Sequence, residues 1–230
     1  MKSLNEYFEE FGTDKQQSVH NYAAFYERYL SRVRDEPNHI LEIGVHKGSS
    51  IKAFASYLPN STIVGVDINK FAQDFEINQV NKHPERGDII YKLLNMLTPE
   101  FEDFVKEYQP GFDFVIDDAS HQNSHIIQVF EKVFPYLKSG GIYFIEDIHA
   151  SFHEYFGIKG EAVNFFKGLI DKVTLTENNE YVLAEIGGGF GWRVGNKNDQ
   201  KVQESEKLDY YNKNIKSILF SQGMIIIEKL

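Results

Sequence analysis

The middle of the chain alternates short β-rich apolar runs with longer segments of helical periodicity, and this alternation limits the fold more than any other feature. Five runs are predicted to be strands: His39 to Val45, Thr62 to Ile68, Asp88 to Leu94, Phe112 to Asp118 and Gly141 to Asp147. Between them, apolar residues return every three or four positions in four predicted helices: Ser49 to Tyr57, Lys70 to Asn81, Pro99 to Tyr108 and His121 to Leu137. This pattern is typical of an α/β domain in which helices cover both faces of a mostly parallel sheet.

The two ends of the chain add further elements to this central pattern. Ser3 to Phe11 and Tyr22 to Val33 are predicted helices, so residues 1–36 are expected to form a helical cap before a domain of residues 37–230. The polar stretch of residues 196–214 is expected to be a flexible loop. After the fifth strand we expect a helix at Ile158 to Asp171 and strands at Lys172 to Leu175, Tyr181 to Ile186 and Gly223 to Leu230, with the final pair as an antiparallel edge.

Composition narrows the classes of function. The 230 residues, of which 42% are hydrophobic, suffice for one domain with a sizeable core. Asp and Glu outnumber Lys and Arg by 34 to 24, and this acidic balance argues against a nucleic-acid partner. The chain has no cysteine, so any metal must be held by carboxylates or imidazoles. We find no signal peptide and no membrane span, and therefore expect a cytoplasmic protein.

A glycine-bearing turn follows the first predicted strand. Gly44 and Gly48 stand four residues apart where the strand turns into a helix, which lets the backbone approach a ligand closely. Asp67 ends the next strand, in the position from which a carboxylate accepts hydrogen bonds from ribose hydroxyls. These features predict a nucleoside site, the alternative being a plain strand-to-helix turn. The motif G-x-G-x-x-G is absent, which argues against a dinucleotide.

Two predicted strands end in pairs of acids, Asp117-Asp118 and Glu146-Asp147. Because the carboxyl ends of such strands meet at one edge of a sheet, four carboxylates there would repel one another, and we expect a cation between them. Hard oxygen ligands such as carboxylates suit Mg²⁺ better than zinc or copper. Glu146 and Asp147 can both bind one ion only if the chain leaves extended geometry at that point. Alternatively, some of these acids cap helices.

His121 follows Asp118 by three residues at the start of a predicted helix. An imidazole titrates near neutrality, so it can take a proton from a hydroxyl whose acidity a nearby metal has raised. A histidine at a helix start is otherwise an ordinary polar residue. Beside the acids we interpret His121 as a general base.

The glycine turn resembles that of a known family. Glu42-x-Gly44-x-x-x-Gly48 followed by Asp67 resembles motifs I and II of the class I S-adenosylmethionine (AdoMet)-dependent methyltransferases. The resemblance implies a Rossmann-like, doubly wound sheet of seven strands. It also implies cofactor contacts: Glu42, Gly44, Gly48 and Ser50 in the loop that borders the methionine part, Asp67 on the ribose and Asn95 on the adenine amine. For Asn95 the role of a turn asparagine stays equally open.

The acidic segments resemble a narrower family. Ile116 to His121 followed by Gly140 to Asp147 is similar to the metal-dependent sugar O-methyltransferases of macrolide tailoring, the mycinamicin type. The resemblance implies that Asp118, Glu146 and Asp147 bind Mg²⁺, that His121 is the base, and that neighbouring sugar hydroxyls complete the coordination. It extends to the segment Phe11 to Lys15, to His20 and Tyr22, and to the stretch Ile218 to Lys229.

We therefore predict an AdoMet-dependent O-methyltransferase that acts on a sugar hydroxyl of a glycan or glycosylated natural product, with a homo-oligomer left open. Four alternatives remain. Catechol-type and other small-molecule O-methyltransferases share the acid spacing but usually carry lysine where His121 stands. A metal-dependent hydroxylase would require two histidines and one carboxylate as metal ligands. A non-catalytic AdoMet-binding module would leave the acids without a purpose, and a dehydrogenase would want the absent glycine motif.

Overall fold

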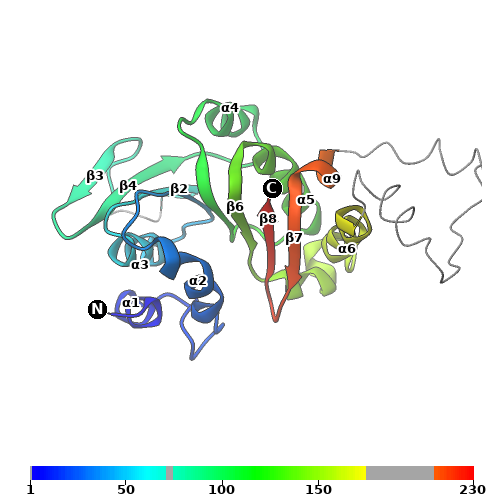
Figure 1. Ribbon diagram of the computed structural model, residues 1–230, viewed down its shortest axis with the longest axis horizontal. Helices are drawn as coiled ribbons and strands as arrows, with labels where there is room; N and C mark the ends of the chain where they lie inside the picture. The colour runs from blue at the N-terminus through cyan, green and yellow to red at the C-terminus, as the bar shows by residue number, and fades with distance from the viewer. Residues whose placement is uncertain (1, 71–74, 175–209) are drawn as a thin grey trace, which may run out of the picture.

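The computed structural model describes residues 2–70, 75–174 and 210–230. Within them the chain forms one eight-stranded sheet in the order β3-β4-β2-β1-β5-β6-β8-β7 (Figure 1). The central pairs β4-β2, β2-β1, β1-β5 and β5-β6 are parallel, whereas β3, β8 and β7 pair antiparallel. The strands are β1 (His39–Ile43), β2 (Thr62–Asp67), β3 (Val80–His83), β4 (Arg86–Leu93), β5 (Phe112–Asp117), β6 (Leu137–Ile145), β7 (Ile215–Phe220) and β8 (Ile225–Lys229).

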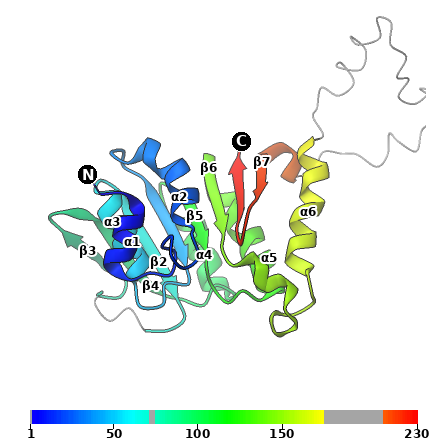
Figure 2. The ribbon, with the colours of Figure 1, turned by 90° about the horizontal axis from the view of Figure 1, so that it is seen from below.

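Helices cover both faces of the sheet. In Figures 1 and 2, α1 and α3 lie together on one side, and α5 and α6 lie on the other. Side chains on β1 divide between these layers: Ile40 joins the core beneath α1, α2 and α3, whereas Leu41 and Ile43 join the core beneath α4, α5 and α6. This two-residue period is the reason the β-rich runs are apolar throughout. The helices are α1 (Leu4–Phe11), α2 (Ala23–Leu30), α3 (Ser49–Tyr57), α4 (Pro99–Glu107), α5 (Asn123–Val133), α6 (Glu161–Thr174) and the short α9 (Tyr210–Asn214).

The helices that precede the sheet are integral to its first core. Ser3 caps α1 by accepting a hydrogen bond from the backbone N–H of Glu6, whose carboxylate in turn accepts from the N–H of Ser3. This capping box begins the helix where the sequence predicts it. Leu4 and Phe8 of α1 are fully buried against α2 and α3. As a consequence the segment between α1 and α2 is held close to the edge of the sheet.

The order of the strands reverses at β1. The chain passes from β1 outward through β2 to β4, then returns to place β5 and β6 on the other side of β1. Ile43 at the end of β1 is in register with Val66 of β2 and with Asp117 of β5. The turns that follow these strands therefore leave the sheet side by side. Such a reversal opens a crevice at the carboxyl edge, where ligands bind in open α/β sheets.

The α/β class, the parallel centre and the five central strands are confirmed, but two predicted elements are wrong. Lys70 to Asn81 is not a helix in its described part: Ile77 bridges to Tyr91 of β4, and β3 begins at Val80. Here alternate side chains pack on β4, a pattern that a short apolar run does not distinguish from a helix. Lys172 to Thr174 continues α6 rather than forming a strand, because Val173 extends the apolar stripe of that helix.

The edges of the sheet also differ from the prediction. Among the described residues the sheet has eight strands rather than seven, since β3 adds an edge. The antiparallel edge is confirmed, but β8 pairs there with β7, a strand that the sequence analysis did not predict. The expected strand Tyr181 to Ile186 and most of the expected loop 196–214 lie outside the described residues, and Tyr210–Asn214, at the end of that loop, is the helix α9. No helix in the described parts of the chain is both long and apolar enough to span a bilayer.

Candidate active site

The turn after β1 runs directly beneath the turn after β5. Gly44 has a φ of 91°, and a Cβ at this position would lie 2.6 Å from the carbonyl carbon of Asp118 and 2.7 Å from the Cα of Ala119. Ordinary contacts begin near 3.4 Å, so only glycine fits here. The turn ends at Gly48, which caps α3 with a φ of 84°. The glycine turn is thus shaped by the backbone that carries the acids.

Asp67 fixes two turns at once. Its Oδ2 accepts hydrogen bonds from the backbone N–H groups of Val45 (3.0 Å) and His46 (2.8 Å). Its Oδ1 accepts one from the N–H of Asn69 (2.8 Å). The carboxylate therefore holds the turn after β1 against the turn after β2, and it stands at the wall of a pocket.

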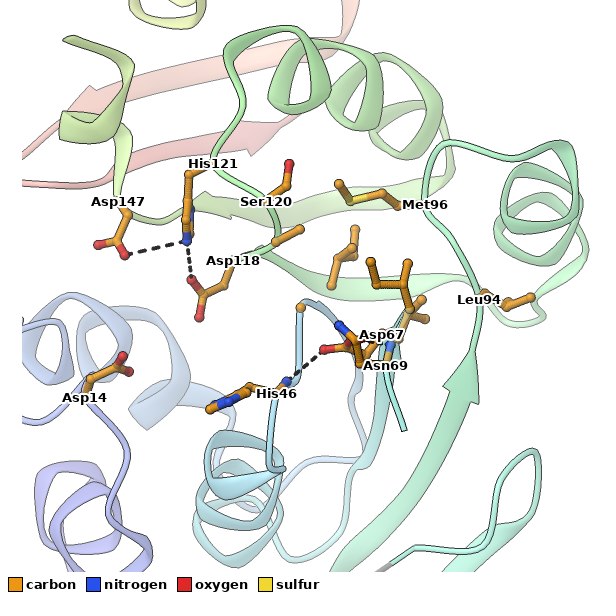
Figure 3. A pocket seen from close by; sticks show the side chains of 15 residues that line it. Asp14, His46, Asp67, Asn69, Leu94, Met96, Asp118, Ser120, His121 and Asp147 are labelled. Atoms are coloured by element: carbon orange, nitrogen blue, oxygen red, sulfur yellow. Dashed lines mark hydrogen bonds and ion pairs between the residues drawn. The ribbon is translucent and has the colours of Figure 1, made fainter. Parts of the chain in front are cut away.

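That pocket has a volume of about 420 Å³ and follows the carboxyl edge of the sheet (Figure 3). Met96, Leu94 and Asp67 lie at one end, and the acids Asp118 and Asp147 lie at the other. The volume falls in the range of sites for small ligands. The lining consists of Asp14, from the segment between α1 and α2, and of residues at the ends of β1 and β2 and in the turns after β1, β2, β4, β5 and β6: Ile43, Gly44, His46, Val66, Asp67, Ile68, Asn69, Leu94, Met96, Asp118, Ala119, Ser120, His121 and Asp147.

Only some of the residues predicted to bind the cofactor line the pocket. Gly44 and Asp67 line the pocket, whereas Glu42, Gly48 and Ser50 do not. Glu42 is fully buried, and its Oε2 accepts a hydrogen bond from the Ser50 hydroxyl (2.9 Å). Burial raises the pKa of Glu42 to about 7, against the opposing charge of the Lys15 ammonium. Glu42 thus belongs to the wall behind the turn.

Asn95 lies just outside the pocket. Its side-chain oxygen accepts a hydrogen bond from the backbone N–H of Leu97 (3.0 Å), and its carbonyl accepts one from the Thr98 hydroxyl. The neighbours Leu94 and Met96 line the pocket instead. Asn95 thus makes the contacts of a turn asparagine, and its role at the adenine amine stays a prediction.

At the acidic end of the pocket, Asp118, His121 and Asp147 face one another (Figure 3). The Nε2 of His121 lies 3.9 Å from Oδ1 of Asp118 and 3.9 Å from Oδ2 of Asp147. One ligand atom from each residue falls within 4.8 Å of the other two. His121 and Asp147 have φ values of 55° and 50°, so the chain leaves extended geometry just after β6, as joint binding by the last two acids would need.

Glu146 turns away from this group. It is buried behind the pocket, where Oε2 accepts a hydrogen bond from the Lys15 ammonium (2.8 Å) and Oε1 accepts one from the Tyr26 hydroxyl. Lys15 also donates to Oδ2 of Asp118 and lies 3.5 Å from Oε1 of Glu42. Three carboxylates thus surround one buried ammonium.

Burial and charge shift the pKa values in this cluster. Burial, followed by the nearby charge of Asp118, raises the pKa of Glu146 well above its ordinary value. Burial opposes the charge on Lys15, but three carboxylates outweigh it and raise the pKa of the ammonium. Burial also acts to raise the pKa of Asp147, yet the Tyr22 hydroxyl and the His121 imidazole together hold it below its ordinary value. Asp147 therefore favours its charged form, in contrast to Glu146.

Sequence reasoning assigned no role to four residues of the site. Lys15, His20 and Tyr22 entered the analysis only through the family resemblance, and Tyr26 was not singled out. Each of them contacts an acid more than one hundred positions further along the chain. A lysine and a histidine in a short segment between two amphipathic helices are the only local signal for them.

Comparison with known proteins agrees with this geometry. Residues 41–148 match a protein family described as a methyltransferase domain. The chain carries a class I methyltransferase domain. Its similarity to curated proteins is to sugar-modifying enzymes: it is 34% identical over 217 residues to the L-olivosyl-oleandolide 3-O-methyltransferase of Streptomyces antibioticus, covering 85% of this chain and 54% of that protein. It is 29% identical to the mycinamicin VI 2''-O-methyltransferase of Micromonospora griseorubida, covering 74% of this chain and 44% of that protein.

The solved structures support the fold of this methyltransferase domain. The MycE methyltransferase of the mycinamycin biosynthetic pathway, in complex with Mg and SAH, superposes with a TM-score of 0.75 at 24% identity. The superposition covers 99% of this chain and 54% of that one. The chain thus spans about half the length of the relatives it matches. The α/β architecture described above, with its N-terminal helices, is shared with MycE.

Proposed function

We propose that this methyltransferase domain transfers the methyl group of AdoMet to a sugar hydroxyl of a glycosylated natural product or glycan, with the help of a divalent cation. One observation carries the proposal. A single pocket joins the Asp67 turn, suited to a nucleoside, to the group of Asp118, His121 and Asp147, suited to a metal and a proton transfer. The named functions of the curated relatives, which methylate sugars on macrolides, support the same assignment.

AdoMet fits the end of the pocket that is formed by the turns after β1, β2 and β4. Gly44 lines the pocket at the turn after β1, and the carboxylate of Asp67 is held in place for the ribose hydroxyls. Leu94 and Met96 offer apolar surface to an adenine ring. AdoMet supplies a methyl group that is already reactive because it is bound to a sulfonium. Direct contacts of Glu42, Gly48, Ser50 and Asn95 with the cofactor stay predictions.

The acidic end fits a hard divalent cation such as Mg²⁺. Mg²⁺ binds oxygen ligands at about 2.1 Å and is usually held by one or two protein carboxylates with waters or substrate oxygens. Oδ1 of Asp118 and Oδ2 of Asp147 both face the pocket and are close enough to share one ion. Asp147, whose pKa is held below its ordinary value, contributes a negative charge that the Lys15 ammonium does not pair with, because Lys15 contacts Asp118 and Glu146 instead. Participation of Glu146 stays a prediction, since its oxygens contact Lys15 and Tyr26.

In this proposal His121 acts as the general base. When bound, the cation would raise the acidity of an acceptor hydroxyl in the pocket. The imidazole of His121 takes the proton as the hydroxyl oxygen forms its bond to the methyl carbon and the carbon–sulfur bond breaks, which leaves S-adenosylhomocysteine. Asp118 and Asp147 flank the ring and stabilise the positive charge that it gains. Most of the acceleration comes from holding the two reactants in contact.

Exposed apolar side chains beyond Asp147 suit the non-sugar part of an acceptor. Phe152, Tyr155 and Ile158 are exposed, and the ring of Phe156 meets that of His121 edge to face with centroids 6.2 Å apart. An apolar surface beside the base favours a small glycoside with a hydrophobic aglycone. A cytoplasmic location, the absence of a nucleic-acid partner and the state of assembly stay predictions.

Calorimetric titration tests the proposal. Wild-type protein is titrated with AdoMet and then with Mg²⁺, beside an Asp147→Asn variant, which keeps the shape of the side chain and removes its charge. We expect AdoMet to bind both proteins and Mg²⁺ to bind only the wild type. Methyl transfer from labelled AdoMet is then followed on macrolide and flavonoid glycosides, with and without a chelator. Failure of AdoMet to bind the wild type would refute the assignment.

A further inference from the structure

The segment between α1 and α2, with the first residues of α2, lies directly behind the acids of the site. Lys15 is only 1% exposed although it is an ammonium, and its Nζ donates hydrogen bonds to Oδ2 of Asp118 and to Oε2 of Glu146. A buried charge of this kind is costly unless it is paired. Asp118 and Glu146 therefore provide the pairing that the buried charge of Lys15 needs.

The same segment holds Asp147. The Tyr22 hydroxyl donates a hydrogen bond to Oδ1 of Asp147 (2.7 Å), and Nδ1 of His20 lies 3.1 Å from the same oxygen. Tyr22 is itself fixed, since it is 2% exposed and its hydroxyl lies 3.1 Å from the carbonyl oxygen of Gly223. Asp147, whose carboxylate must be oriented, has a left-handed backbone conformation that most residue types disfavour.

In Asp118 and in Asp147, the two carboxylate oxygens have different partners. Asp118 presents Oδ2 to Lys15 and Oδ1 to His121. Asp147 presents Oδ1 to Tyr22 and His20, and Oδ2 to His121. One oxygen of each acid is thus held from behind, and the other faces the pocket.

We propose that Lys15, His20 and Tyr22 are positioning residues that hold Asp118 and Asp147 with one oxygen each toward the pocket and thereby set the affinity of the site for a divalent cation. This inference rests on the proposed function, because it assigns these residues to the metal end of that site. Groups that orient metal-binding side chains in this way typically change metal affinity or activity by about 10-fold to 100-fold when removed.

A purely structural role makes a different prediction. If the three residues only attach the N-terminal helices to the sheet, their removal lowers thermal stability and leaves the cation affinity of the folded protein unchanged. Cation affinity therefore separates the two roles, and it does so without a methyl acceptor.

The experiment measures binding of Mn²⁺ to AdoMet-saturated protein by the electron paramagnetic resonance signal of the free aqueous ion. The informative variant is Tyr22→Phe, which removes one hydroxyl and keeps the ring. Tyr29→Phe is the matched control, because Tyr29 lies on α2 and packs its ring on Phe144 away from the acids. We expect Mn²⁺ affinity to fall about 10-fold or more for Tyr22→Phe. For Tyr29→Phe we expect no change, and for both variants an unchanged AdoMet affinity.

Lys15→Met and His20→Asn extend the series. Lys15→Met keeps the length of the side chain and removes the ammonium; because loss of this positive charge by itself favours cation binding, weaker Mn²⁺ binding in this variant would be due to the lost orientation of Asp118. If Lys15→Met fails to fold, Tyr22→Phe and His20→Asn decide the question, because both residues lie at the edge of the cluster. Variants that fold and bind Mn²⁺ as the wild type does would overturn the inference and leave the proposed function intact. A wild type that binds AdoMet but no Mn²⁺ would overturn the inference together with the metal part of the proposed function.

Discussion

Substitution of Gly44 by alanine tests whether the glycine turn and the acidic turn are shaped by each other. The added Cβ would lie 2.6 Å and 2.7 Å from backbone atoms of Asp118 and Ala119, where ordinary contact begins near 3.4 Å. The two turns must therefore separate by about 1 Å, a displacement of the size that can cost about 100-fold in rate at an active site. The left-handed φ of 91° adds about 1–2 kcal/mol of backbone strain for alanine.

Gly140→Ala is a matched control for the strain. Gly140 also has a positive φ, 75°, but a Cβ there would meet nothing within 4 Å. We expect the backbone strain to lower the melting temperature of both variants by roughly 2–8 °C, since about 2–4 °C accompany each kcal/mol in a domain of this size, and the clash to lower that of Gly44→Ala further. Only Gly44→Ala should weaken AdoMet binding, by about 10-fold or more in calorimetric titration. Equal AdoMet affinity in Gly44→Ala and the wild type, or an equal loss in Gly140→Ala, would refute the reasoning.

Three further predictions concern the cofactor acid, the base and the rear of the sheet. Asp67→Asn replaces charge-assisted hydrogen bonds by neutral ones, so calorimetry should show AdoMet binding weakened by about 10-fold. His121→Asn, which tolerates the left-handed backbone, should lower the single-turnover rate of methyl transfer by about 100-fold to 10,000-fold with AdoMet and Mn²⁺ affinities unchanged. An unchanged rate would exclude His121 as the base. Lys229→Met should lower the free energy of unfolding by about 2 kcal/mol in urea denaturation, because the ammonium donates to the carbonyls of Phe134, Pro135 and Leu137, whereas exposed Lys216→Met should change it by less than about 0.5 kcal/mol.

The central elements could be predicted because each satisfies a local rule. The apolar run of β1 is buried on both faces, and Ser3 and Glu6 form a capping box that begins α1. Phe75 and Ile77 misled the prediction because they pack on β4, a contact formed by the tertiary fold rather than by the local sequence. The division into residues 1–36 and 37–230 stays a prediction.

In the site, too, local sequence predicts some features and the tertiary fold decides others. Gly44, Asp67, Asp118, His121 and Asp147 all follow strands that meet at one edge, so their proximity follows from the order of the elements. The direction in which each side chain points does not follow from the order of the elements. Whether Glu146 faces the pocket or the interior depends on Lys15 and Tyr26, whose positions come from the packing of the N-terminal helices.

The turn between β7 and β8 has a consequence for protein synthesis. The carbonyl oxygen of Gly223 accepts a hydrogen bond from the backbone N–H of Ile148 (3.1 Å) and lies beside the Tyr22 hydroxyl. This turn therefore supports the residue that follows Asp147 in the chain and the tyrosine that donates a hydrogen bond to Asp147. On a ribosome that adds about 5–20 residues per second, the strands that carry Asp67 and Asp118 emerge well before Gly223 does. A nascent chain can therefore shape the cofactor turn early and complete the acidic end only after residues 215–230 have left the exit tunnel.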